Sequence, residues 1–191
     1  MGRLGEPTLP PDDARARLAS LPSVQRASLT AGGLGFARFA PGTWGSLPPC
    51  VAVLVLCAAL PAGLGWVVQA AIGAFIALAC AGCVRWGARA EEALGLKDPS
   101  CVVLDEVAGM AIALFLLRWP LRSESDGWGW LWTACAGLAM AFALFRAFDV
   151  LKPPPCRALQ GVRGGTGILL DDVFAGIYAS VVMHLVGPLA G

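Results

Sequence analysis

The chain has 191 residues, of which 57% are hydrophobic and only 14% are charged, and its mean hydropathy is +0.69. Soluble domains carry about a quarter charged residues, so this composition excludes a disordered chain and argues against a water-soluble domain. It indicates an integral membrane protein. The 14 basic and 13 acidic residues leave a net charge of +1, which provides no general attraction for nucleic acid.

Residues 1–32 are polar and lack the unbroken apolar run of a secretory signal, so we expect a flexible cytoplasmic tail there. Five stretches then approach the length that crosses a bilayer, namely 47–62, 63–84, 101–117, 127–145 and 168–190. The first is short and begins with Pro48 and Pro49, so it either spans or re-enters the membrane. The sequence therefore predicts an all-α, polytopic membrane helical bundle over residues 33–191, with about four to five membrane segments.

The distribution of basic residues predicts the orientation of this bundle. If the N-terminus is cytoplasmic and all five stretches cross, 12 basic residues lie on the inner side, and only Arg118 and Arg122 lie outside. This asymmetry is the one that the positive-inside rule describes. We therefore expect the loops before residue 47, between 84 and 101, and between 145 and 168 to face the cytoplasm.

Six acidic residues lie within or beside the apolar stretches, all near the predicted inner face. They are Asp98, Asp105, Glu106, Asp149, Asp171 and Asp172. A carboxylate at membrane depth is costly unless it is paired or bound to a metal, so such residues usually mark function. Single acids at helix N-termini are favoured by the helix dipole, but two adjacent pairs and further acids at one depth exceed that explanation. We expect these acids to converge.

Cationic side chains accompany the acids. Arg146, Asp149 and Lys152 follow one another at intervals of three, which places them on one helix face before a run of prolines. A simpler interpretation is an intrahelical ion pair with Lys152 extending toward water. Beside clustered carboxylates, however, two cations suit a phosphate group.

Two glycine-containing loops could bind an oxyanion through backbone N–H groups. Arg163, Gly164 and Gly165 precede the helix that carries Asp171 and Asp172, and a helix N-terminus favours anions. Residues 41–46 precede the first apolar stretch and offer the hydroxyls of Thr43 and Ser46. Each loop alone is a weak signal, because glycine is common at membrane boundaries.

The donor types limit the chemistry. The single histidine, His184, lies twelve residues after Asp172, about 18 Å along a helix, so histidine-dependent phosphatase chemistry is not expected. Cys83 and Arg89 have a cysteine-phosphatase spacing but lie at the end of an apolar helix, and an odd total of seven cysteines does not indicate a disulfide framework. Oxygen ligands without imidazole or thiolate favour a hard cation, Mg²⁺, which bridges carboxylates to phosphate.

Four motifs in this order resemble the phosphatidylglycerophosphatase A family over about residues 33–182. They are Pro41-Gly-Thr-Trp-Gly-Ser46, Asp98 with Val103-Leu-Asp-Glu-Val-Ala-Gly109, Phe145-Arg-Ala-Phe-Asp-Val-Leu-Lys-Pro153, and Gly164-Gly-Thr-Gly-Ile-Leu-Leu-Asp-Asp-Val-Phe-Ala-Gly-Ile-Tyr-Ala179. The resemblance implies a Mg²⁺-dependent phosphatase of the bacterial inner membrane. Its expected reaction converts phosphatidylglycerophosphate in the inner leaflet to phosphatidylglycerol and phosphate, with the active site facing the cytoplasm.

The motifs and the resemblance together suggest residue roles. We expect Mg²⁺ to be held by Asp105, Glu106, Asp171 and Asp172. Asp98, Asp149, Arg146 and Lys152 are the expected catalytic residues, and Thr43, Ser46, Arg163, Gly164 and Gly165 the expected phosphate-binding residues. Either water or an aspartate could be the nucleophile.

Three other functions deserve comparison. An ion or proton transporter also keeps acids in the membrane, but it usually places some near the midplane, whereas the deep halves of these stretches are uncharged. A CDP-alcohol phosphotransferase would carry a D-x2-D-G-x2-A-R motif, which this sequence lacks. A non-catalytic scaffold would tolerate neutral residues at the acidic positions. The sequence does not indicate the head-group selectivity or the oligomeric state.

Overall fold

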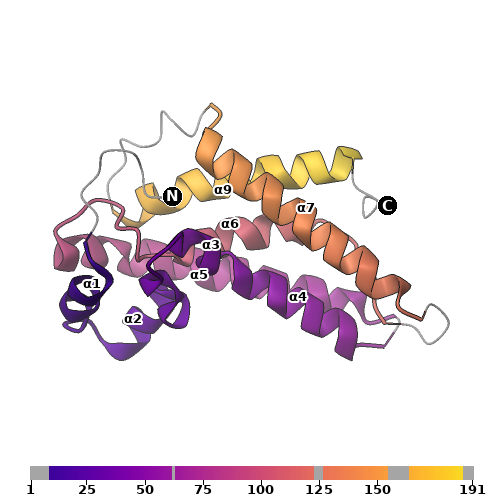
Figure 1. Ribbon diagram of the computed structural model, residues 1–191, viewed down its shortest axis with the longest axis horizontal. Helices are drawn as coiled ribbons and strands as arrows, with labels where there is room; N and C mark the ends of the chain where they lie inside the picture. The colour runs from indigo at the N-terminus through magenta and orange to yellow at the C-terminus, as the bar shows by residue number, and fades with distance from the viewer. Residues whose placement is uncertain (1–8, 62, 123–126, 155–163, 187–191) are drawn as a thin grey trace.

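The computed structural model describes residues 9–61, 63–122, 127–154 and 164–186, and the described chain is helical without β-strands. Its long helices run side by side, with two short helices at one end (Figure 1). In chain order the elements are α1 (Pro11–Leu18), α2 (Ser23–Leu29), the 3₁₀ helix η1 (Ala31–Phe36), α3 (Pro41–Gly45), α4 (Leu47–Ala59), α5 (Gly65–Leu94), α6 (Leu104–Phe115), α7 (Gly129–Leu151) and α9 (Gly165–Val186). The expected all-α bundle is confirmed.

Four helical stretches are long and apolar enough to cross a membrane. They are Pro41–Ala59, Gly65–Leu94, Gly129–Leu151 and Gly165–Val186. The first joins α3 to α4 in one span of 19 residues, so the first predicted stretch, 47–62, gains its length on the N-terminal side. The chain is therefore a multi-pass membrane protein.

The third predicted stretch, 101–117, contains only the 12-residue α6, which is about 18 Å long. This helix is shorter than a span, and it packs against α4, α5, α7 and α9. Nine of its residues are buried. α6 is thus the central helix of the bundle.

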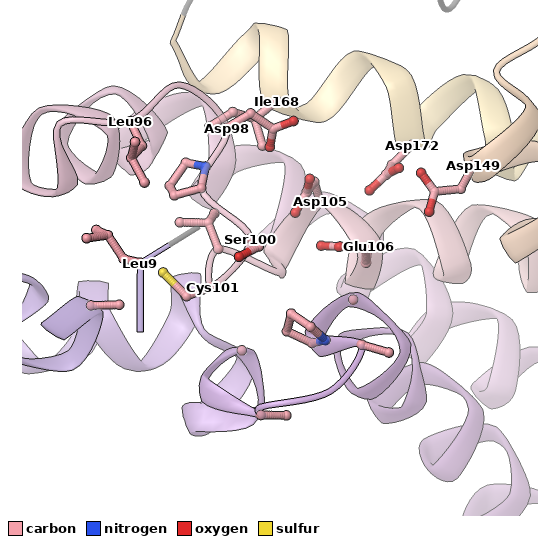
Figure 2. Close-up of a pocket in the computed structure, with 18 of the residues that line it drawn as sticks. Leu9, Leu96, Asp98, Ser100, Cys101, Asp105, Glu106, Asp149, Ile168 and Asp172 are labelled. Carbon is pink, nitrogen blue, oxygen red and sulfur yellow. The ribbon is translucent and has the colours of Figure 1, made fainter. Parts of the chain in front are cut away.

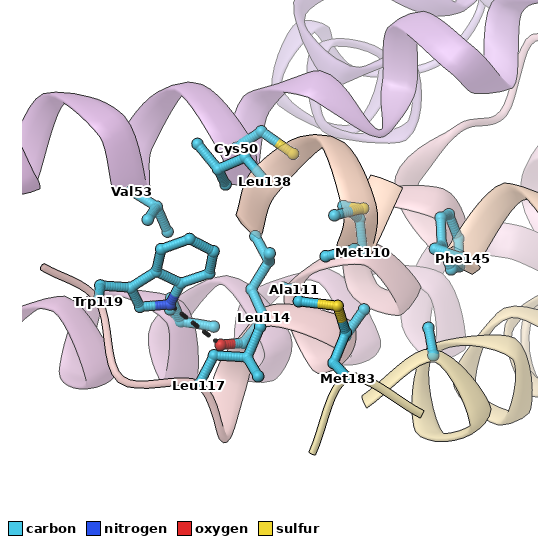
Figure 3. Close-up of a cluster of buried hydrophobic side chains, with 14 of the residues drawn as sticks. Cys50, Val53, Met110, Ala111, Leu114, Leu117, Trp119, Leu138, Phe145 and Met183 are labelled. Atoms are coloured by element: carbon cyan, nitrogen blue, oxygen red, sulfur yellow. Dashed lines mark hydrogen bonds between the residues drawn. The ribbon is translucent and has the colours of Figure 1, made fainter. Parts of the chain in front are cut away.

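Non-helical chain continues from α6 toward the far end of the bundle, and protein groups satisfy its backbone. The Gln69 side-chain amide donates to the Leu117 carbonyl at 2.5 Å, and the Arg122 N–H donates to the Cys57 carbonyl at 2.8 Å. Trp119 folds back and donates to the Leu114 carbonyl at 3.2 Å, within the apolar core (Figure 3). Irregular backbone at membrane depth is tolerated where the protein supplies such partners.

The expected flexible tail is partly helical. Within residues 9–32, α1 and α2 pack against α5, and Leu18 and Leu29 are fully buried. The Arg17 guanidinium donates to the Leu94 carbonyl at 2.9 Å. Ala14 and Leu18 are spaced by four residues, so even this polar segment buries one apolar stripe.

Candidate active site

A pocket of about 700 Å³ opens where α6 and α9 begin and α7 ends. Its walls carry all six acids that the sequence singled out, together with both cations of the third motif. These residues are Asp98, Asp105, Glu106, Asp149, Asp171, Asp172, Arg146 and Lys152. Segments that lie far apart in the chain therefore bring acidic and basic groups into one cavity.

Three of the acids form a compact group. Asp105 and Glu106 lie in the first turn of α6, and Asp172 lies in the second turn of α9. One carboxylate oxygen from each residue lies within 4.8 Å of the others. Figure 2 shows these three side chains turned toward one another, with Asp149 facing Asp172 from α7. This spacing suits a shared cation.

Glycines allow the helices that carry these acids to approach closely. Gly109 and Gly176 each follow an acid, Asp105 or Asp172, by four residues, which is one helical turn. A Cβ atom on Gly176 would lie 2.3 Å from the Gly109 carbonyl oxygen, and one on Gly109 would lie 2.6 Å from the Asp172 carbonyl oxygen. The two backbones therefore touch directly beside the carboxylates.

Gly42 has a similar role on the α3 side. A Cβ atom there would lie 2.3 Å from Glu106 Oε1, so a larger residue would force that carboxylate to move. The sequence reading placed Gly42 in a phosphate-binding loop, but residues 41–45 form helix α3. The motif thus packs against a carboxylate.

The electrostatics of the α6 acids favour a cation. Burial raises the pKa of Asp105 well above its usual range, and the neighbouring Glu106 charge raises it further. Burial also raises the pKa of Glu106 to about 8. Asp105 Oδ1 and Glu106 Oε2 are buried without a hydrogen-bond partner, which is costly. These oxygen donors, without histidine or thiolate among them, fit a hard divalent cation such as Mg²⁺.

Two ion pairs hold the cationic side chains. Arg146 Nη1 lies 2.9 Å from Asp149 Oδ2 within α7, and Lys152 Nζ lies 2.5 Å from Asp171 Oδ2 of α9. The intrahelical pair that the sequence allowed is therefore present for Arg146, whereas Lys152 reaches across to another helix. Asp171, which we grouped with the expected metal ligands, contacts this cation through Oδ2.

Asp98 lies in the connection between α5 and α6 with a positive φ of 47°. Its N–H donates to Glu91 Oε1 at 3.0 Å, and the Gly164 N–H donates to Glu91 Oε2 at 3.1 Å. Glu91 thus ties the Asp98 turn to the start of α9. Sequence reasoning missed Glu91, because nothing in its spacing distinguishes it from a solvated acid at the end of α5.

Of the expected phosphate-binding residues, the four that the structure describes do not line the pocket. The Ser46 hydroxyl is buried and donates to the Gly42 carbonyl at 2.8 Å, and Thr43 is not among the lining residues. Gly165 packs against α5, where a Cβ atom would lie 1.8 Å from the Cys83 carbonyl oxygen. Gly164 already donates to Glu91, and Arg163 lies outside the described residues.

Two further cations line the pocket, Arg38 and Lys97. The sequence analysis counted them only as inner-side basic residues. Their positions, three residues before the Pro41 motif and directly before Asp98, are the signals that could have identified them.

Comparisons with known proteins identify the family of this chain. The sequence model of the family described as phosphatidylglycerophosphatase A matches residues 27–187. The chain is 34% identical over 155 residues to a phosphatidylglycerophosphatase A of Haemophilus influenzae, covering 81% of this chain and 83% of that protein. It is 33% identical over 95 residues to the Escherichia coli protein of that name, covering 49% of this chain and 48% of that protein.

A third relative is a Bacteroides thetaiotaomicron protein named "Putative phosphatidylinositol-3-phosphatase". It is 37% identical over 152 residues, which cover 79% of this chain and 86% of that protein. No solved structure matches the chain. Because the family model covers most of the sequence, including every acid of the pocket, the chain belongs to the phosphatidylglycerophosphatase A family of lipid phosphatases.

Proposed function

We propose that this protein removes the terminal phosphate of phosphatidylglycerophosphate in a Mg²⁺-dependent reaction, giving phosphatidylglycerol and inorganic phosphate. The observation that supports this most directly is the group of Asp105, Glu106 and Asp172, in which Asp105 Oδ1 and Glu106 Oε2 are buried without a hydrogen-bond partner. Two cations, Arg146 and Lys152, share the same pocket. The names of two relatives supply the substrate.

The depth of the pocket suits a lipid phosphate. A Cβ atom on Gly82 of α5 would lie 2.6 Å from the Leu104 side chain at the start of α6. Three residues later, at Arg85, α5 changes from an apolar to a charged sequence. The carboxylates therefore lie close to the boundary between hydrocarbon and water, where lipid head groups reside.

In this proposal Asp105, Glu106 and Asp172 hold Mg²⁺, which, when bound, polarises the phosphoryl group of the substrate. The guanidinium of Arg146 and the ammonium of Lys152 bind the non-bridging phosphoryl oxygens, on which charge spreads in the transition state. Their ion pairs with Asp149 and Asp171 fix both cations before the substrate arrives.

In this proposal Asp149 acts as the general base. It is held by Arg146 and faces Asp172 (Figure 2), so it can accept a proton from the attacking water. The water oxygen forms a bond to phosphorus as the bond to the glycerol oxygen breaks, and that oxygen takes up a proton to give the product alcohol. Asp98, which also lines the pocket, adds negative charge near the carboxylate group that would hold the cation.

The choice of lipid follows from the relatives. Both lipids in their names carry a phosphodiester next to the glycerol and a terminal phosphomonoester on a polyol. We favour phosphatidylglycerophosphate because the family model and two relatives carry that name. Basic residues are in excess in the loops that lie on the pocket side of the bundle. By the positive-inside rule, this excess favours a pocket that faces the cytoplasm, in the bacterial inner membrane.

The test is phosphate release by the purified, detergent-solubilised protein. Phosphatidylglycerophosphate, phosphatidylinositol 3-phosphate and phosphatidic acid would be compared, with EDTA and after Mg²⁺ is restored. We expect the first lipid to be hydrolysed fastest, EDTA to abolish turnover, and Mg²⁺ to restore it. Asp172→Asn should lose at least ~100-fold, whereas Asp13→Asn, an exposed acid on α1, should not. Turnover that resists EDTA, or an active Asp172→Asn variant, would refute the metal assignment.

A further inference from the structure

The proposed substrate carries a second phosphate, the phosphodiester, which the residues described so far do not bind. The terminal monoester lies at the carboxylate group in the proposed mechanism, while the acyl chains remain in the membrane. The diester must therefore lie between these two points, at the side of the pocket that opens to lipid.

One side of the pocket has the character of such an opening. Its walls include Ala40, Pro41 and Gly42 from the start of the first span, and Arg146 and Val150 from the end of α7. A Cβ atom on Gly42 would lie 3.2 Å from Arg146 Nη1, so these two segments are adjacent. Val150 lines the pocket and yet is 68% exposed, which indicates an apolar rim.

Arg38 and Phe39 lie in the bend between η1 and α3, directly before Ala40 and Pro41 of this rim. Arg38 lines the pocket, and Phe39 is 84% exposed. A cation facing the pocket beside an aromatic side chain facing outward matches the order of groups in a phospholipid, where the phosphate precedes the acyl region. Among the described residues, Arg38 forms no ion pair that would compete with a ligand.

We infer that Arg38 binds the phosphodiester of the lipid substrate and so selects lipids that carry both a diester and a terminal monoester. This inference rests on the proposed function. Arginine suits the role because its guanidinium forms two parallel hydrogen bonds with a phosphate group. The polyol between the two phosphates then spans the pocket, which explains how one family could serve lipids with different head groups.

The test compares two competitive inhibitors of phosphatidylglycerophosphate hydrolysis. Phosphatidylglycerol keeps the diester and lacks the monoester, whereas inorganic phosphate resembles only the monoester. Arg38→Gln should raise the KM for substrate and the inhibition constant of phosphatidylglycerol by about tenfold or more, the effect of one charge-assisted hydrogen bond. The inhibition constant of inorganic phosphate should change less than about twofold. Diacylglycerol at equal concentration controls for dilution of substrate in the micelle.

Two further variants complete the design. Arg38→Lys should recover part of the lost affinity, because it keeps the charge without the two parallel donors. Arg89→Gln removes an exposed cation that lies near the C-terminal end of α5 and does not line the pocket. This variant should leave both inhibition constants unchanged. Equal thermal stability of all variants in detergent would show that each is folded.

The outcomes separate the two proposals. If the wild-type protein releases no phosphate from phosphatidylglycerophosphate, the proposed function fails. If the wild-type protein is active but Arg38→Gln leaves KM and both inhibition constants unchanged, the inference alone is overturned. Equal weakening of phosphatidylglycerol and inorganic phosphate would place Arg38 at the monoester and would also overturn it.

Discussion

The contact between Gly109 and Gly176 makes a sharp prediction, because it lies one turn from the carboxylates on each helix. In Gly176→Ala, the new methyl group would lie 2.3 Å from the Gly109 carbonyl oxygen, and an ordinary contact begins at 3.4 Å. Helices α6 and α9 must therefore separate by about 1 Å. Overpacking of this kind costs about 1–3 kcal/mol, and a displacement of about 1 Å at a catalytic group can cost on the order of 100-fold in rate.

The assay measures phosphate release as a function of Mg²⁺ concentration, together with the thermal unfolding midpoint in detergent. We expect Gly176→Ala to need at least ~10-fold more Mg²⁺ for half-maximal activity and to turn over about 100-fold more slowly. Gly73→Ala is the matched control, because its methyl group would meet Phe115 at an ordinary 3.5 Å in another membrane helix. A Gly176→Ala enzyme with wild-type Mg²⁺ dependence and rate would show that the helix contact does not position the acids.

Four further variants test other parts of the site. Glu91→Ala removes two hydrogen bonds to backbone N–H groups, each worth ~1 kcal/mol. We expect a lower thermal unfolding midpoint and slower phosphate release. A variant with unchanged stability and rate would contradict the role of Glu91. Lys152→Met removes the cation beside buried Asp171 and should destabilise the protein by roughly 3 kcal/mol. The double variant Lys152→Met with Asp171→Leu should regain stability in urea titrations but not activity. Recovery of activity in the double variant would exclude Lys152 from phosphate binding. Ser46→Ala should keep its KM within about twofold, because its hydroxyl is already bonded to Gly42; a large rise in KM would restore the phosphate-binding interpretation.

The acids of the site could be identified from the sequence because they violate the rule for apolar helices. A carboxylate next to a membrane helix has few structural explanations, so Asp105, Glu106 and Asp172 stood out without any knowledge of the fold. The helical class and most of the spans followed from apolar length alone. These features depend on residue type and local spacing, which a single sequence contains.

The remaining features depend on contacts between distant segments. The apolar stretch 101–117 is almost long enough to span a membrane. Hydropathy could not show that the helix ends at Phe115, because buried irregular chain is equally apolar. The glycines before Asp171 resembled an anion-binding loop, yet the Gly164 N–H is occupied by Glu91 from 73 residues away. The role of Gly42 likewise depends on the position of Glu106, which no local pattern reveals.

The division of the three central carboxylates between α6 and α9 has a consequence for biosynthesis. Asp172 belongs to the last helix of the described chain, whereas Asp105 and Glu106 precede it by more than sixty residues. A nascent chain that has inserted only its earlier helices thus holds only part of this group of carboxylates. In the proposed mechanism the complete group forms only after α9 has joined the bundle, and translation products that end before Asp172 are expected to release no phosphate from lipids.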